Sequence, residues 1–231
     1  MPQPLPPDYM AYDRTIVVFS PDGRLLQVEY ARQMVKNGTT AIGIKTNEGI
    51  LLGAVKSPMP LAVSYRKIYR IDDHIGVVSA GSLADARNLV DISRVKAQIN
   101  KITYNEPISV STLTKYICDR KHLVTQYAGV RPYGVGLLIG GVDKTGYRLF
   151  ETEPSGTMIE WHAQVIGRGA EKAKNVLKKE YREGIDLKAG QRLMIKALKA
   201  GEREANPNNI DAFLISKKGL KEISLKETKS N

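Results

Sequence analysis

The amino-acid sequence predicts an α+β fold in four layers, with two β-sheets packed face to face and a pair of helices over each outer face. The predicted elements follow the order helix, strands, two helices, strands, two helices, strands. Polar and apolar residues alternate only weakly along most of the strands. Weak alternation is typical of strands that are buried on both sides, so a four-layer αββα sandwich would cover every apolar surface.

A first helix is expected near residues 21–36. Ser20 is a residue type that caps helices, Pro21 would occupy the first helical position, and Gly38 lies just beyond the end. Apolar residues recur along the segment at steps of three or four, at Leu25, Val28, Ala31 and Val35. The helix therefore has one face to bury.

The chain is expected to divide into a short tail and one domain. Four of the first seven residues are proline, which removes amide donors and favours an extended segment. Residues 1–11 are thus predicted to form a mobile tail. Residues 12–231 are predicted to form a single domain that includes the first helix.

The first half of this domain is expected to hold four strands followed by two helices. Runs of β-branched and aliphatic residues, separated by turn-forming clusters, predict strands at Thr39–Lys45, Gly49–Lys56, Arg66–Ile71 and Ile75–Ala80. Apolar residues then recur at helical spacing over residues 82–102 and 109–127, and Pro107 separates the two helices.

The second half is expected to repeat the arrangement. Strands are predicted at Gly134–Val142, Tyr147–Thr152 and Thr157–Ile166, helices at 169–182 and 187–203, and final strands at Ile210–Ser216 and Leu220–Ser224. Thr157–Ile166 alternates cleanly, which predicts one strand that presents Ile159, Trp161, Ala163 and Val165 on a single face.

The composition is that of an ordinary globular protein, with 231 residues of which 42% are hydrophobic and 26% charged. Cys118 is the only cysteine, which excludes an internal disulfide and a multi-cysteine zinc site. No stretch reaches the roughly 20 apolar residues of a membrane span, and the first residues lack the pattern of a signal peptide. A cytoplasmic protein without a membrane partner is therefore expected.

The formal net charge of +11 is compatible with a polyanionic partner such as nucleic acid. However, the excess is spread along the chain, and no basic strand with interleaved aromatic residues accompanies it. A solvated basic surface is the preferred interpretation, and nucleic acid is not an expected partner. One basic stripe falls on a single helical face and is expected to meet solvent or an acidic partner: Lys188, Arg192, Lys196, Lys199 and Arg203.

No metal site or cofactor is expected. The three histidines, His74, His122 and His162, are far apart in the sequence, and none lies beside Cys118 or a carboxylate at metal-ligand spacing. Gly167-Arg168-Gly169 lacks the further glycine of a phosphate-binding loop and is interpreted as a tight turn between a strand and a helix.

Thr39 raises the question of covalent catalysis. A threonine at the start of a strand becomes an amino-terminal nucleophile if the preceding peptide bond is cleaved, because its free amine then acts as the base. Lys67 could supply the neighbouring cation, but the second strand, Leu51–Val55, has no carboxylate to orient it. A structural strand is the preferred interpretation, and a self-processing amino-terminal threonine hydrolase is the alternative.

Five segments together carry a resemblance that extends over essentially the whole chain. They are Tyr12-Asp13-Arg14, the run FSPDGRLLQVEYA from Phe19 to Ala31, the strand GTTAIGI from Gly38 to Ile44, Ala84-Asp85-Ala86-Arg87, and GVRPYG from Gly129 to Gly134. In these segments the chain resembles the α-type subunits of the proteasome core particle, in their archaeal form. The resemblance implies the four-layer αββα sandwich of the amino-terminal nucleophile hydrolase type, in agreement with the order of elements.

The resemblance implies a non-catalytic subunit. The β-type relatives of this family use an exposed amino-terminal threonine, an acid on the second strand and a lysine, whereas Val55 stands where ungapped counting would put that acid. α-type subunits form a seven-membered ring that caps the catalytic β rings, gates substrate entry and receives regulatory ATPase rings. Other α subunits, β subunits and a regulatory ATPase ring are accordingly the expected partners.

The resemblance also implies a gate. The proline-bearing tail would close the pore, and the cluster that holds an open gate matches Tyr12, Asp13, Pro21 and Tyr30. Proline fixes a turn, while a carboxylate and two phenols can form hydrogen bonds with neighbouring chains.

Two further sites follow from the same resemblance. Lys67, together with Gly81, matches the pocket that binds the terminal carboxylate of an activator's tail, a task for which a lysine offers a point charge and three donors. The pore constriction matches Tyr127, Ala128 and Gly129. Ala128 stands where archaeal relatives tend to have glycine, and Ser82 stands where an aliphatic residue is common beside the pocket.

Overall fold

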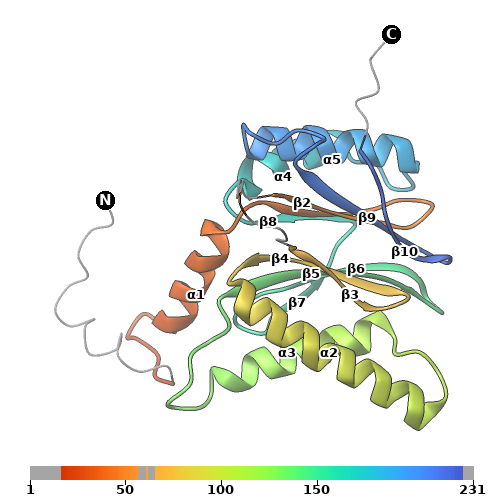
Figure 1. Cartoon of the computed structure of the whole chain (residues 1–231). Helices are drawn as coiled ribbons and strands as arrows, with labels where there is room; N and C mark the ends of the chain where they lie inside the picture. Colours follow the sequence, from red (N-terminus) through yellow and green to blue (C-terminus); the bar gives the residue numbers. More distant parts are fainter. Residues whose placement is uncertain (1–16, 57–60, 62–65, 226–231) are drawn as a thin grey trace.

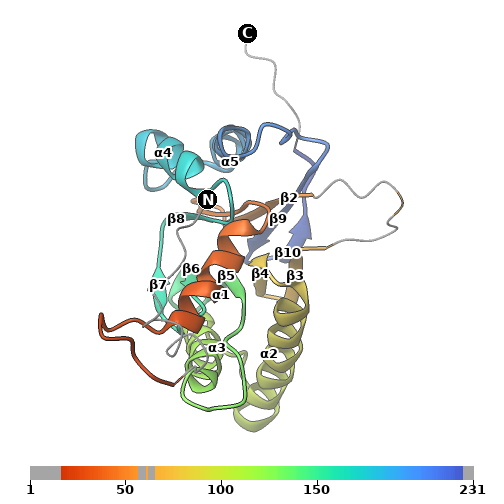
Figure 2. The same ribbon diagram turned by 90° about the vertical axis from the view of Figure 1, so that its left-hand side faces the viewer.

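The computed structural model describes residues 17–56, 61 and 66–225. These residues form the predicted four layers, in which two sheets face each other and a pair of helices covers each outer side (Figures 1 and 2). The helix pairs are α4 (Ala170–Glu180) with α5 (Leu187–Gly201), and α2 (Leu83–Tyr104) with α3 (Val110–Val124). The predicted αββα sandwich is confirmed.

Helix α1 (Leu26–Asn37) belongs to neither pair and crosses one end of the sandwich (Figure 2). It packs against β4 and β5 of one sheet, with Val35 close to Gly136, and its residues Leu26, Val28 and Ala31 are buried. The chain then turns at Gly38 and enters the other sheet. Helix α1 therefore lies beside the open ends of both sheets.

The sheet under α4 and α5 has the strand order β10-β9-β2-β1-β8, and all neighbouring strands are antiparallel. Its strands are β1 (Ala41–Lys45), β2 (Ile50–Val55), β8 (Ala163–Ile166), β9 (Ile210–Ser216) and β10 (Gly219–Glu222). All residues of β2 are buried, because helices cover one side of the strand and the second sheet covers the other. Burial on both sides explains the weak alternation in the sequence.

The sheet over α2 and α3 has the order β3-β4-β5-β6-β7 and is likewise antiparallel. Its strands are β3 (Ile68–Asp72), β4 (Ile75–Gly81), β5 (Val135–Asp143), β6 (Gly146–Thr152) and β7 (Met158–Glu160). Three apolar clusters fill the spaces between successive layers. One residue of each cluster is Leu198 of α5, Leu113 of α3 and, between the two sheets, Leu138 of β5.

The later helices begin as their sequences predict. The Ser82 hydroxyl accepts a hydrogen bond from the backbone N–H of Asp85, and Asp186 likewise accepts one from Ala189 at 2.7 Å. The predicted basic stripe is exposed at all five of its residues, which confirms that this face does not pack into the core: Lys188, Arg192, Lys196, Lys199 and Arg203. Helix α5 ends at Gly201, so the last of these residues lies beyond it.

The predicted start of the first helix is wrong. Helix α1 begins at Leu26 and not at residue 21, and Ser20 does not cap it. Instead Ser20 closes a tight turn, in which its hydroxyl accepts a hydrogen bond from Arg24 N at 3.1 Å and its own N–H donates to Arg24 O at 2.9 Å. Gly23 allows this turn because it adopts a φ of 73°.

The prediction of one strand over Thr157–Ile166 is also wrong. The segment divides into β7 and β8, which belong to different sheets. Trp161 N donates to Leu149 O of β6, and the next residue, His162, accepts from Lys45 N of β1, so the chain crosses between sheets at this point. Alternation describes which side chains share a face locally, and it contains no information on a change of partner strand.

Candidate functional site

A buried lysine lies at the end of the sandwich where β1 begins. Lys67 is only 3% exposed, and its Nζ donates hydrogen bonds to both the carbonyl oxygen and Oγ1 of Thr39, each at 2.5 Å. Burial lowers the pKa of Lys67 to about 8, although the nearby Glu202 carboxylate opposes the shift. The two hydrogen bonds to Thr39 hold the buried amine of Lys67 in place.

The next residue, Thr40, is held by a carboxylate that also forms an ion pair. The Glu202 carboxylate accepts hydrogen bonds from Thr40 N and from Arg168 Nη2, both at 2.5 Å. Burial alone raises the pKa of Glu202, but these hydrogen bonds outweigh burial and hold its pKa below the usual value. Thr40 Oγ1 also accepts from Gly169 N at 2.9 Å. The carboxylate near Thr39 is thus engaged in holding β1 to the start of α4.

The second strand offers no acid to the Lys67–Thr39 pair. Val55 is buried, and its N–H donates to Thr40 O at 3.0 Å, beside the start of β1. The following residue, Lys56, pairs with Asp211 at 2.9 Å. The arrangement holds a lysine against a threonine hydroxyl without a carboxylate from the second strand.

Three glycine backbones meet beside this pair. A Cβ on Gly38 would lie 2.3 Å from Gly81 N, and a Cβ on Gly81 would lie 2.3 Å from Gly134 O. Gly81 also has a φ of 109°, which favours glycine. We call Gly38, Gly81 and Gly134 the glycine junction. It brings Gly81 close to the Thr39 backbone that Lys67 contacts, so the two residues expected to bind an activator's tail lie at one end of the sandwich.

The proposed gate cluster is described only in part. Tyr12 and Asp13 lie outside the described residues. Pro21 is exposed in the turn before α1, and Tyr30 is partly exposed on that helix. The exposure of both side chains leaves them accessible from outside the chain.

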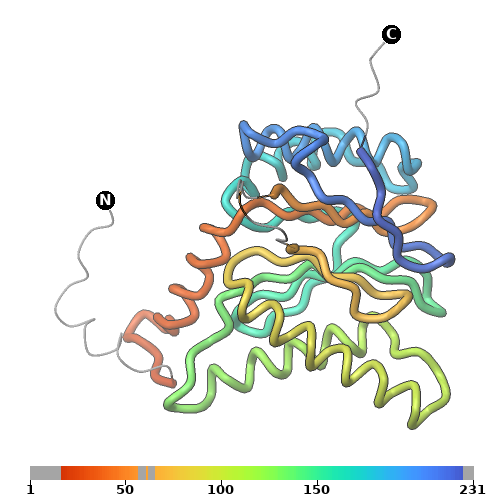
Figure 3. Tube along the Cα trace, viewed as in Figure 1, coloured from red at the N-terminus to blue at the C-terminus, as the bar shows by residue number. Residues whose placement is uncertain are grey.

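The residues expected to constrict the pore lie between α3 and β5. Tyr127, Ala128 and Gly129 are all exposed, and Gly129 has a φ of 86° with open space around it. This segment passes beside α1 before it enters the sheet (Figure 3). It is anchored at its end by Arg131, which forms a two-point ion pair with Asp85.

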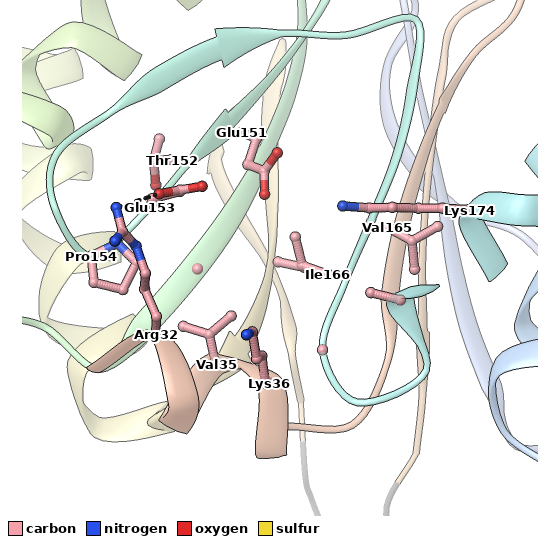
Figure 4. Close-up of a pocket in the computed structure, with 13 residues that line it drawn as sticks. Arg32, Val35, Lys36, Glu151, Thr152, Glu153, Pro154, Val165, Ile166 and Lys174 are labelled. Carbon is pink, nitrogen blue, oxygen red and sulfur yellow. Dashed lines mark hydrogen bonds and ion pairs between the residues drawn. The ribbon is translucent and has the colours of Figure 1, made fainter. Parts of the chain in front are cut away.

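Sequence reasoning missed a cavity of about 200 Å³ between α1, β6 and β8. Figure 4 shows Arg32, Lys36 and Lys174 around it and the Glu151 carboxylate pointing into it. Glu151 is buried and accepts a hydrogen bond from Gln164 Nε2 at 2.5 Å. The lining residues come from separate segments of the chain, so no local motif could have revealed this cavity.

Sequence reasoning also missed the buried Lys121. Its Nζ donates to Val135 O, Thr152 O and Thr152 Oγ1 at 2.8, 3.2 and 2.8 Å, and its side chain is fully buried. Burial lowers the pKa of Lys121 to about 7. Lysines are rarely fully buried, and one in the last turn of a helix such as α3 is an ordinary feature, so the sequence contained no signal for the burial of this one.

Two further kinds of feature are absent from the part of the chain that the structure describes. Its histidine, cysteine and acidic side chains form no group of three or more that could hold a metal ion. None of its helices combines the length and the apolar character needed to cross a membrane.

Comparison with known proteins identifies the family. Residues 35–215 match the family model for proteasome subunits, and residues 12–33 match the N-terminal signature of the A-type proteasome subunits. The proteasome alpha subunit of Methanopyrus kandleri is 48% identical over 96% of this chain and 92% of its own length. The corresponding values are 47%, 98% and 88% for that of Methanocaldococcus jannaschii, and 53%, 84% and 82% for that of Methanoculleus marisnigri. The chain therefore belongs to the proteasome family, in which it is an alpha subunit.

Proposed function

We propose that this alpha subunit is non-catalytic and forms the outer seven-membered ring of a proteasome core, where it gates substrate entry and docks a regulatory ATPase ring. The observation that carries the proposal is that the second strand offers no carboxylate to the Lys67–Thr39 pair: Val55 is buried there, and Glu202 is already bonded to Thr40 and Arg168. An amino-terminal nucleophile needs an acid that orients its neighbouring cation as well as its own free amine. The contact of Lys67 with Thr39 thus reproduces only part of the geometry of a threonine hydrolase.

Two contacts support retention of the residues before Thr39. Cleavage after Gly38 would remove α1, whose buried residues include Leu26 and Val28. It would also separate Gly38 from Gly81 in the glycine junction. Both losses expose packed surface, so an uncleaved chain is favoured.

The proposed site residues serve the passage of substrate. Residues 1–11 act as the gate, and Tyr12, Asp13, Pro21 and Tyr30 hold it open. Lys67 and Gly81 receive the terminal carboxylate of an activator's tail, and Tyr127, Ala128 and Gly129 line the constriction. The proposed setting is the cytoplasm, with β subunits beneath the ring.

Removal of residues 1–11 tests the proposed function. In particles assembled with β subunits, the deletion should accelerate hydrolysis of a short fluorogenic peptide and leave the seven-membered ring intact by native mass spectrometry. A rate equal to that of the full-length particle, with rings intact, would argue against a gate in this segment.

A second candidate, a self-processing threonine hydrolase, is favoured by one observation, the hydrogen bond from Lys67 Nζ to Thr39 Oγ1. Intact-mass measurement separates the two functions. A processed enzyme would lose residues 1–38, whereas a gate subunit keeps them.

A further inference from the structure

The pocket expected for an activator's tail and the segment expected to line the pore meet at the glycine junction. Ser82 N, directly after Gly81, donates to Gly134 O at 2.9 Å. Gly134 lies at the end of residues 125–134, the connection between α3 and β5, and Tyr127 to Gly129 belong to the same connection. We call residues 125–134 the pore segment.

Asp85 holds the pore segment onto the start of α2. Arg131 Nη1 and Nη2 donate to its two carboxylate oxygens at 2.7 and 2.8 Å, and Gly134 N donates to Oδ2 at 2.9 Å. Burial alone raises the pKa of Asp85, but the hydrogen bonds from Arg131 and Gly134 outweigh it and keep the pKa below its usual value. An ionised carboxylate with three such donors holds its partners in one relative position. We call Asp85, Arg131 and Gly134 the Asp85 clamp.

The glycine junction connects the Asp85 clamp to Lys67. Gly38 packs against Gly81 and is covalently joined to Thr39, the residue to which Lys67 donates twice. Gly38, Gly81 and Gly134 touch through their backbones, with no side chain between them that could change rotamer and absorb a shift. In a close-packed region, displacement of one such backbone is passed to the next.

We propose that the Asp85 clamp couples the Lys67 pocket to the pore segment, so that occupancy of the pocket by a carboxylate changes the position of Tyr127 to Gly129. This inference rests on the proposed function and deepens it. Arg131 is the positioning residue in this coupling. Its role is to hold the pore segment against the start of α2.

A mutant cycle on the assembled particle tests the coupling without an activator. Hydrogen exchange is measured by mass spectrometry on peptides that cover residues 126–134, in the wild type, Lys67→Ala, Arg131→Gln and the double variant. Each single change should raise exchange several-fold. The double variant should exchange no faster than Arg131→Gln, because the connection is already broken. Multiplicative effects of the two changes would overturn the proposal.

A matched control is available in the sheet that the pore segment enters. Arg148 forms a two-point ion pair with Glu160 across β6 and β7, away from the junction. Arg148→Gln should leave the effect of Lys67→Ala on residues 126–134 unchanged. The Arg131 side chain is 66% exposed, so its replacement is tolerated by the core. Asp85→Asn keeps the shape of the side chain, and it can replace Arg131→Gln in a second mutant cycle with Lys67→Ala.

A second measurement separates docking from activation. With a regulatory ATPase ring of archaeal type, Arg131→Gln particles should bind the ring with the same Kd as the wild type but show several-fold less stimulation of peptide hydrolysis. A Kd that weakens in step with stimulation would instead make Arg131 part of the docking site and overturn the coupling. If the ring neither binds nor stimulates wild-type particles, the proposed function fails, and the exchange cycle still decides whether the clamp couples the two segments.

Discussion

Lys67 Nζ lies 2.5 Å from the Oγ1 atom of Thr39, although the two residues are 28 positions apart in the sequence. This contact places a cation against a threonine hydroxyl, as nucleophilic catalysis requires. This contact explains the enzyme-like geometry, and the docking role proposed for Lys67 requires a carboxylate to replace Thr39 as its partner.

Lys67→Ala is expected to abolish stimulation by a regulatory ATPase ring. A charge-assisted hydrogen bond contributes about 1.5–3 kcal/mol, and repetition of the pocket around a ring multiplies the effect through avidity. Lys67→Arg keeps the charge but changes its shape and reach, so it should restore stimulation only in part. The measurement is peptide hydrolysis with and without the ATPase ring.

Lys56→Ala is the matched control for Lys67, because Lys56 lies directly after β2 and its side chain is 46% exposed. It should leave stimulation unchanged. If Lys67→Ala eliminated hydrolysis even in intact particles without the ATPase ring, the lysine would belong to a catalytic site, and the non-catalytic assignment would be wrong.

The buried Lys121 should make stability depend on pH. Burial lowers its folded-state pKa to about 7, against the opposing influence of Cys118 and nearby carboxylates such as Glu151. Between about pH 7 and the ordinary lysine value near 10.5, the unfolded chain therefore binds more protons than the folded one. Unfolding free energy should rise with pH across this window, and Lys67 acts in the same direction from about pH 8.

Lys121→Met tests this prediction. The thermal midpoint of the variant should rise less between pH 7 and 9.5 than that of the wild type. Lys115→Met is the control on the same helix, because Lys115 is exposed and pairs with Asp119 at 2.5 Å. An equal rise in the wild type and Lys121→Met would show that Lys121 does not lose its proton on folding in this range.

Gly81→Ala should destabilise the chain more than Gly146→Ala. The two glycines have nearly equal φ values, 109° and 108°, so alanine suffers similar backbone strain at both positions. A Cβ at Gly146 meets open space, whereas one at Gly81 lies 2.3 Å from Gly134 O. Strain costs about 1–3 kcal/mol at both positions, and at Gly81 the clash should add about 1–3 kcal/mol more. Denaturant unfolding of both variants measures the difference, and equal losses would show that the junction yields freely.

Replacement of three cations on the exposed basic stripe should have little effect on stability. Lys188, Arg192 and Arg203 are exposed, and surface substitutions of this kind usually change stability by less than about 0.5 kcal/mol each. The triple glutamine variant should melt within a few degrees of the wild type by differential scanning calorimetry. A large loss of stability would show that this face packs against another part of the particle.

Local patterns in the sequence determined the kinds of elements and their order. The apolar spacing along α2 and α5 predicted helices that the structure confirms, and the uniformly apolar run of β2 predicted burial on both sides. The motifs around Phe19–Ala31 and Gly129–Gly134 indicated the family before any geometry was known. These features were predictable because each depends on residues that are close together in the chain.

Only the tertiary structure decided which distant residues meet. Lys67 and Lys121 have the same side chain as the exposed lysines of α5, yet both are buried because distant parts of the chain supply oxygen atoms that accept hydrogen bonds from their amines. The division of Thr157–Ile166 between two sheets likewise depends on hydrogen bonds to β6 and β1. Periodicity reports how a segment is buried, whereas the identity of the partner is set by long-range packing, which no local pattern contains.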